Sequence, residues 1–187
     1  MTPVSFDRHA VTVDIVLFTI HKDTLKVLLV KREKTPFKGK WALPGGEVRS
    51  NESVDEAALT QLQKETQVGN VYLEQLYTFG DLKRDPRGRI ITVTYYAPVH
   101  HDRFRFETSP NGHGVQMFPV HRIPPLAFDH EQIVQYALER LRHKVNYTTI
   151  CFQLLPERFT LSELQRAYEI ILNQRLDKRN FRKKMLQ

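Results

Sequence analysis

The stretch GGEVRSNESVDEAALTQLQKETQV, residues 45–68, sets how the rest of this chain is interpreted. Its two leading glycines predict a tight turn or a close approach of the backbone, because glycine has no Cβ. Ser53 and Glu56 have the spacing of a capping box, which predicts that a helix begins there. Four apolar residues then fall on one side of that helix, as expected for a face that packs on a core: Val54, Ala57, Ala58 and Leu62.

This stretch resembles the Nudix box, the loop–helix–loop signature of hydrolases that act on linked nucleoside diphosphates. The signature reads G-x5-E-x7-R-E-U-x-E-E-x-G-U, where U is aliphatic. Five positions of this chain match it: Gly46, Glu52, Leu62, Glu65 and Val68. The resemblance implies a Nudix fold, in which the helix carries carboxylates that bind divalent cations.

The departures from the signature fall where the family performs its chemistry. Thr60 replaces the arginine, Gln61 and Lys64 replace two glutamates, and Gln67 replaces the late glycine. Hard cations such as Mg²⁺ are bound by carboxylate oxygens, and a lysine beside the one remaining carboxylate, Glu65, would repel a dication. We therefore expect no catalytic residues and no required cofactor. The alternative is weak metal binding by Glu52 and Glu65, with Mg²⁺ serving residual hydrolysis.

Composition and charge exclude several classes of protein. The chain has 187 residues, 41% of them hydrophobic, and a single cysteine, Cys151, so a disulfide framework is excluded. No apolar run approaches the ~20 residues of a membrane span, which predicts a soluble, cytoplasmic protein. The net charge is +7, and residues 175–187 hold six Lys/Arg and one Asp, so most of the excess lies at the C-terminal end. Such a cluster indicates a nucleic-acid partner or a solvated basic tail.

The periodicity along the chain predicts an α/β fold. Residues 10–20 and 25–31 form a strand pair joined at His21-Lys22-Asp23, and residues 71–77, 89–98 and 117–120 are further strands. A second amphipathic helix over residues 133–141 follows a start at Asp129. Strands on both sides of a central helix predict an α/β/α sandwich with a mixed sheet, which the Nudix resemblance also implies. We place this domain at residues 1–145.

The remaining residues, 146–187, predict a small helical domain. Thr160 and Glu163 form a second capping box, and Asp177 caps a last helix in which Phe181 and Met185 face inward. Three basic residues at i, i+3 and i+4 share another face of that helix: Arg179, Arg182 and Lys183. Two short helices, a tight turn and a basic second helix are typical of a helix-turn-helix DNA reader.

A degenerate Nudix box followed by this helical segment resembles the Nudix-related transcriptional regulators of NAD metabolism. The segment that carries the resemblance is FQLLPERFTLSELQRAYEIILNQRLDKRNFRKKML, residues 152–186. The resemblance implies a homodimeric repressor that binds double-stranded operator DNA and senses ADP-ribose or a related NAD metabolite. The winged part that such domains carry after the last helix is not found before Gln187.

Two sets of residues are the candidates for these roles. For the effector we select the box, its flanks and the basic loop of residues 80–88, in which Lys83 also lies: Trp41, Gly46, Glu52, Lys64, Glu65, Arg84, Arg87 and Arg89. Phe37, Trp41, Tyr77 and Phe79 are candidates for stacking on adenine, with core packing as the alternative. For DNA we select the last helix: Lys178, Arg179, Asn180, Arg182, Lys183 and Lys184. The eight histidines have no metal-ligand spacing and are interpreted as structural or surface residues.

Two other functions remain open at this stage. One is an ADP-ribose pyrophosphatase that uses unusual metal ligands and carries an accessory C-terminal module. The other is a non-catalytic nucleotide-binding protein whose basic end contacts RNA or another protein.

Overall fold

The computed structural model describes residues 8–67, 71–104 and 114–186, and arranges them around one mixed sheet. Its seven strands follow the order β3-β2-β1-β6-β5, with β4 paired to β1 and β7 paired to β2. β1 and β6 run parallel, and the other pairings are antiparallel. The strands are β1 (Ala10–His21), β2 (Thr24–Lys31), β3 (Trp41–Ala42), β4 (Gly45–Glu47), β5 (Glu74–Phe79), β6 (Ile90–Pro98) and β7 (Val115–Pro119).

A two-residue turn, Lys22 and Asp23, joins β1 to β2. The predicted turn lies at the correct place but included His21, which is the last residue of β1 and pairs with Thr24. Lys22 and Asp23 both have positive φ, 50° and 56°. Positive φ at two successive residues is the conformation that matches the twist of a tight β-hairpin. The turn projects Asp23 toward the C-terminal segment, where its carboxylate accepts a hydrogen bond from Arg166 at 3.1 Å.

The prediction of a tight turn at the two glycines is wrong, whereas the close approach is confirmed. Gly45 and Gly46 lie in β4, paired with Asp14 and Val13 of β1. A Cβ at Gly45 would lie 2.3 Å from the carbonyl oxygen of Val13, and one at Gly46 would lie 2.4 Å from Nε2 of Gln61. The glycines are needed because β4 is pressed between β1 and the helix that follows.

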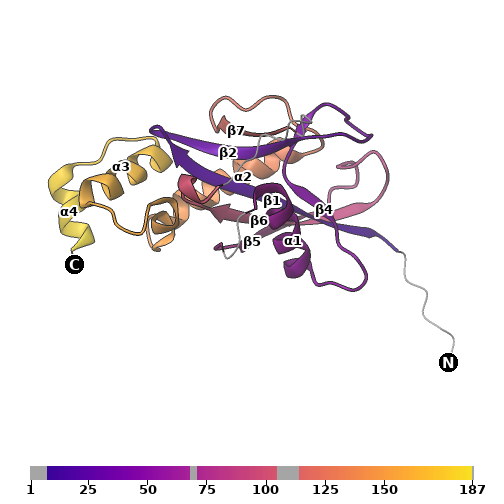
Figure 1. Ribbon diagram of the computed structural model, residues 1–187, viewed down its shortest axis with the longest axis horizontal. Helices are drawn as coiled ribbons and strands as arrows, with labels where there is room; N and C mark the ends of the chain where they lie inside the picture. Colours follow the sequence, from indigo (N-terminus) through magenta and orange to yellow (C-terminus); the bar gives the residue numbers. More distant parts are fainter. Residues whose placement is uncertain (1–7, 68–70, 105–113, 187) are drawn as a thin grey trace.

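Two helices cover opposite faces of the sheet (Figure 1). α1 (Val54–Thr66) starts at the predicted capping box of Ser53 and Glu56. It packs on the face that carries Val13, Ile15 and Leu17 of β1. Because side chains alternate along a strand, the even-numbered residues of β1 face the other layer, where α2 (His130–Lys144) lies. This arrangement confirms the predicted α/β/α sandwich.

The C-terminal segment contains the 3₁₀ helix η2 (Ile150–Leu154), α3 (Leu161–Leu172) and α4 (Lys178–Met185), and another 3₁₀ helix, η1 (His101–Arg103), follows β6. The capping box at Thr160 and the cap at Asp177 are both present, as the sequence predicts. Asn173 ends α3 in the left-handed conformation, with φ 54°. α3 and α4 lie together at one end of the molecule (Figure 1).

One hydrophobic core joins the sheet to this C-terminal segment. Its buried members include Phe18 of β1, Ile133 and Leu141 of α2, and Leu164 and Ile171 of α3. The boundary that we place at residues 145–146 therefore falls within continuous packing. In the part of the chain that the structure describes, no helix is long and apolar enough to cross a bilayer.

Candidate functional site

A pocket of about 230 Å³ opens at the end of the sheet where β1, β4 and the loop after β5 meet. Its wall combines glycine backbone, one aromatic ring and several charged side chains. The residues that line it are Ala10, Thr12, Asp14, Arg32, Leu43, Gly45, Gly46, Glu47, Arg84, Asp85, Arg87, Ile90, Phe128 and His130. Concave sites with a few convergent polar groups are the usual form of small-ligand sites.

Arg84 forms the floor of this pocket with two carboxylates. Its Nε and Nη2 donate to Oδ2 and Oδ1 of Asp129, at 2.9 and 2.7 Å. Its Nη2 also lies 3.5 Å from Oδ2 of Asp14. Asp14 itself is held by a 2.7 Å hydrogen bond from the hydroxyl of Thr92. Only 3% of the Arg84 side chain is exposed, so its charge is balanced almost entirely by these two neighbours.

His130 closes the same network from the first turn of α2. Its Nδ1 accepts a 2.9 Å hydrogen bond from the backbone N–H of Leu43, so a neutral ring carries its proton on Nε2. Nε2 lies 3.5 Å from Oδ1 of Asp14. Burial lowers the pKa of His130, against the opposing field of Asp14. The neutral ring therefore connects β1, the segment between β3 and β4, and α2, consistent with its interpretation as a structural residue.

Two further arginines of the pocket lining lie over one aromatic ring. The guanidinium carbons of Arg32 and Arg87 lie 4.6 and 5.6 Å from the centroid of Phe128. Arg87 also pairs with Asp85 through Nε and Nη2, at 2.9 and 2.6 Å. Burial raises the pKa of Asp85, but the bonds from Arg87 outweigh it and the net pKa is lowered. Those bonds raise the pKa of Arg87, whereas burial and the field of Arg87 lower that of Arg32.

The charges in the pocket wall are nearly balanced. Three arginines face three carboxylates, those of Asp14, Glu47 and Asp85. Asp129 adds a fourth carboxylate through its bonds to Arg84. An anionic ligand that binds Arg84 or Arg87 must compete with the carboxylates that these two arginines already hold, whereas Arg32 donates to the backbone carbonyls of Lys34 and Pro36.

The structure brings three of the eight predicted effector residues together, because Gly46, Arg84 and Arg87 line this pocket. The other five lie outside its lining. Trp41 packs edge-on to Phe118, Glu52 accepts from the backbone N–H of Arg49, and Arg89 donates to the carbonyl of Gly80. Lys64 and Glu65 lie on the last turns of α1, where Lys64 is exposed.

On the face of α1 that carries the degenerate positions, Gln61 lies next to the pocket. The Gln61 amide lies against Gly46, whereas Thr60 and Lys64 are exposed. Across residues 8–67, 71–104 and 114–186, no cluster of three or more His, Cys, Asp or Glu is arranged to hold a metal ion.

The aromatic candidates for stacking lie in two places. Phe37 packs edge-on to Phe128, at 4.9 Å between centroids, and so lies behind the pocket wall. Tyr77 and Phe79 form a ring cluster with Tyr136 of α2, away from the pocket.

The predicted DNA-binding residues lie along α4. Phe181 is buried and packs edge-on to Tyr168 of α3, at 5.2 Å between centroids. The six polar candidates are exposed: Lys178, Arg179, Asn180, Arg182, Lys183 and Lys184. Lys184 differs from the others, since its Nζ donates to the carbonyl of Asn146 at 3.4 Å. The remaining basic side chains form a solvent-facing surface of the kind that contacts phosphates.

Sequence reasoning missed several residues of the pocket: Asp14, Arg32, Asp85, Phe128 and Asp129. For Asp14 a signal was present, because it is a lone carboxylate in the apolar run AVTVDIVLFTI. Such a residue needs a partner when its strand is buried. Asp129 was identified as a helix start, but its pairing with Arg84, 45 residues away, has no local signal.

Comparisons with known proteins agree with this architecture. Residues 8–137 match the NUDIX domain, and residues 151–187 match the NrtR DNA-binding winged helix domain. The ADPR responsive transcriptional repressor NtrR of Acinetobacter baylyi is 36% identical over 179 residues, which cover 94% of this chain and 72% of that protein. An ADP-ribose pyrophosphatase of Methanocaldococcus jannaschii is 36% identical over 116 residues, which cover 62% of this chain and 67% of that protein.

Two solved structures resemble the chain closely. Shewanella oneidensis NrtR complexed with a 27mer DNA has a TM-score of 0.87 and 39% identity, covering 95% of this chain and 82% of that one. The NUDIX domain of the same protein complexed with ADP ribose has a TM-score of 0.65 and 40% identity, covering 73% of this chain and 90% of that one.

Proposed function

Because this chain belongs to the NrtR family of Nudix-related regulators, we propose that it is a transcriptional repressor of NAD-metabolism genes that responds to ADP-ribose. This proposal rests on two features that share one hydrophobic core. One is a Nudix domain with Gln61 and Lys64 in place of two acidic residues, and the other is an exposed basic helix, α4.

The pocket at Arg84 is the proposed effector site. Guanidinium groups bind phosphate oxygens with two parallel hydrogen bonds, and three arginines face this pocket. Phe128, near both Arg32 and Arg87 in the pocket lining, offers an apolar surface for the base or ribose. This supports a nucleoside diphosphate linked to a sugar, the class that contains ADP-ribose.

In this proposal α4 reads the operator. Its basic side chains neutralise phosphates, and Asn180 and the arginines can reach base edges in the major groove. The protein acts in the cytoplasm as a homodimer, whose two-fold axis matches two half-sites about one helical turn apart. The effector can release the operator only if it binds the DNA-free protein more tightly than the DNA-bound protein.

The similarity to an ADP-ribose pyrophosphatase favours one second candidate, a hydrolase that binds the same ligand. The presence of Gln61 and Lys64 argues against a hydrolase, because these residues stand on α1 where the Nudix signature has two metal-binding glutamates.

The test uses the full chain and a duplex enriched by in vitro selection from a random library. We expect selection to converge on a two-fold symmetric site, and calorimetry to detect binding of ADP-ribose in the absence of divalent cations. Failure to enrich any duplex would contradict the DNA-binding role. Binding that depends on Mg²⁺ and is followed by release of AMP would favour the hydrolase.

A further inference from the structure

The start of α2 differs from the starts of the other α-helices in the described ranges. Ser53, Thr160 and Asp177 each accept a backbone hydrogen bond at the N-cap of α1, α3 and α4. Asp129 occupies the N-cap position of α2 but makes no such bond. Both of its carboxylate oxygens accept from Arg84 instead. Aspartate is among the best N-cap residues, but here the carboxylate that could cap α2 is bonded to the pocket residue Arg84 instead.

The backbone at this junction is held in an unusual conformation. The capping residues Ser53 and Thr160 have extended ψ angles of 164° and 160°. Asp129 has ψ 16°, so its side chain is aimed away from the helix. The preceding residue, Phe128, has φ 55°, which costs energy for a bulky side chain and occurs where surrounding contacts enforce it. The bond between Arg84 and Asp129 is such a contact.

A phosphate in the pocket would compete for the same guanidinium. Phosphate and carboxylate oxygens use the same bidentate geometry on arginine, and two anions beside each other repel. Of the two carboxylates near Arg84, Asp14 is fixed within β1 by the Thr92 hydroxyl at 2.7 Å. Asp129 lies at a loop–helix junction and has another donor close by, the backbone N–H of Glu131, whereas the N–H groups of His130 and Gln132 already donate to the carbonyls of Ala127 and Asp129. Asp129 is therefore the carboxylate that can leave.

The other end of α2 is bonded to the DNA-binding segment. Arg142 donates through Nε to the carbonyl of Ile171, the penultimate residue of α3, at 3.0 Å. Just beyond α2, the carbonyl of Asn146 accepts from Lys184 of α4. Between these ends, Ile133, Ala137 and Leu141 are buried in the core shared with α3. An α-helix of this length spans about 22 Å and moves as one body.

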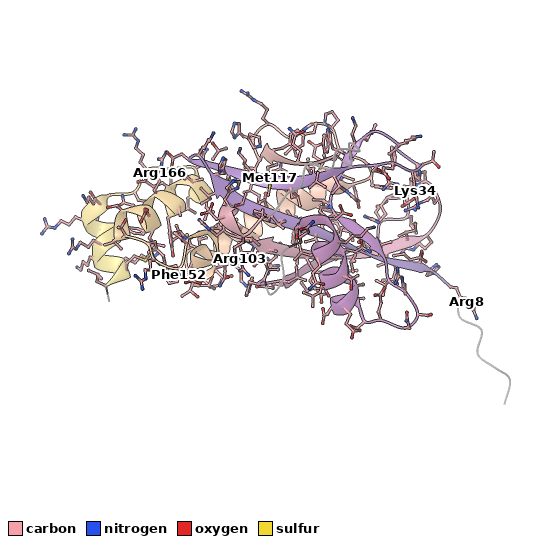
Figure 2. The ribbon with its side chains drawn as sticks, in the orientation of Figure 1. Arg8, Lys34, Arg103, Met117, Phe152 and Arg166 are labelled. Atoms are coloured by element: carbon pink, nitrogen blue, oxygen red, sulfur yellow. The ribbon has the colours of Figure 1, made fainter. Side chains whose placement is uncertain are left out.

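The pocket and α3 are far apart, and α2 connects them. Figure 2 places Lys34, two residues beyond the pocket residue Arg32, at the opposite end of the molecule from Arg166 on α3. A displacement of α2 at its first turn would therefore also act on the bonds to α3 and α4 near its other end.

We propose that Arg84 and Asp129 form the switch through which an anionic effector changes DNA affinity. The phosphate of the effector takes the Arg84 guanidinium, Asp129 turns to cap α2, and the displaced helix shifts α3 and α4 through Arg142 and Asn146. This inference rests on the proposed function, in which the pocket binds a nucleoside diphosphate linked to a sugar.

The first test compares Asp129→Asn with Asp129→Ala in the full chain, using ADP-ribose and the selected duplex. Asparagine caps helices well but cannot form the charged pair, so Asp129→Asn mimics the effector-bound state. We expect its effector-free DNA affinity to fall toward the value of the wild type with ADP-ribose, and its response to ADP-ribose to be less than threefold. Alanine can neither pair with Arg84 nor cap α2. We therefore expect Asp129→Ala to keep the effector-free DNA affinity of the wild type and to lose the response to ADP-ribose.

Glu131→Gln is the matched control, because Glu131 is an exposed acid in the same turn. It should respond as the wild type does. A full response of Asp129→Asn to ADP-ribose would overturn the switch. If the wild type itself neither binds ADP-ribose nor responds to it, the proposed function fails rather than this inference.

A second measurement needs no variant and covers the case in which the substitutions impair folding. Hydrogen exchange of the wild type should show greater protection at the amide of Glu131 when ADP-ribose is bound, because the Asp129 carboxylate then accepts from it. Unchanged exchange at this amide under saturating ADP-ribose would overturn the proposed capping step.

Discussion

Ile171→Ala tests whether the sensor and the DNA-binding segment unfold as one unit. Ile171 lies on α3 with no exposed surface, in the core that also contains Phe18 and Ile133. The substitution removes three carbons, worth about 0.8 kcal/mol each, and leaves a cavity that the rigid neighbours cannot fill. We expect a loss of about 3 kcal/mol, within the range of ~2–5 kcal/mol typical of such changes.

The assay uses urea and two probes. The chain has one tryptophan, Trp41, which lies in β3 of the Nudix domain, whereas far-UV circular dichroism reports all helices. With a urea slope of about 2 kcal/mol per molar, the midpoint should fall by about 1.5 M in both signals. Ser162→Ala is the control, since Ser162 is exposed on the same helix and its loss should cost less than about 0.5 kcal/mol. An unchanged midpoint of Trp41 fluorescence in Ile171→Ala would refute the reasoning and show two independent units.

Three other predictions concern the site and the last helix. Arg182→Ala or Lys183→Ala should each reduce the slope of log affinity against log salt by about one unit, while Lys38→Ala, an exposed lysine far from α4, leaves it unchanged. His130 has a lowered pKa, so the unfolded state binds its proton first and stability is lost as pH falls below about 6.5. Urea titrations of the wild type should therefore lose more stability between pH 7 and pH 5 than those of His130→Asn. The purified chain with ADP-ribose and Mn²⁺ should release no AMP above background. Turnover of about 1 s⁻¹, as in ordinary enzymes, would instead favour the hydrolase function.

The sequence predicted those features whose causes are local. The capping boxes at Ser53 and Thr160 and the cap at Asp177 require only residues three positions apart, and all three are present. The strand pair predicted on either side of residues 21–23 is confirmed as well, although His21 belongs to β1 and only Lys22 and Asp23 form the turn.

The features that sequence reasoning missed depend on distant pairings. Gly45 and Gly46 were expected to open a turn, but they lie in a strand because β1 and Gln61 approach from either side. Arg84 was a candidate, but its partners Asp14 and Asp129 lie 70 residues before it and 45 residues after it in the chain. The role of Lys64 in effector binding stays a prediction, since its exposed position on α1 lies outside the pocket lining.

The central claim is that one ligand in the Nudix domain changes the affinity of α4 for DNA, and a reciprocal titration tests it most directly. The dissociation constant of the selected duplex is measured with and without saturating ADP-ribose, and that of ADP-ribose with and without saturating duplex. Because coupling between two binding sites is reciprocal, both ratios must be equal, and we predict a weakening of about 5- to 150-fold in each direction. Equal affinities with and without the other ligand would contradict the claim. The two domains would then share a hydrophobic core, but their binding sites would not be energetically coupled.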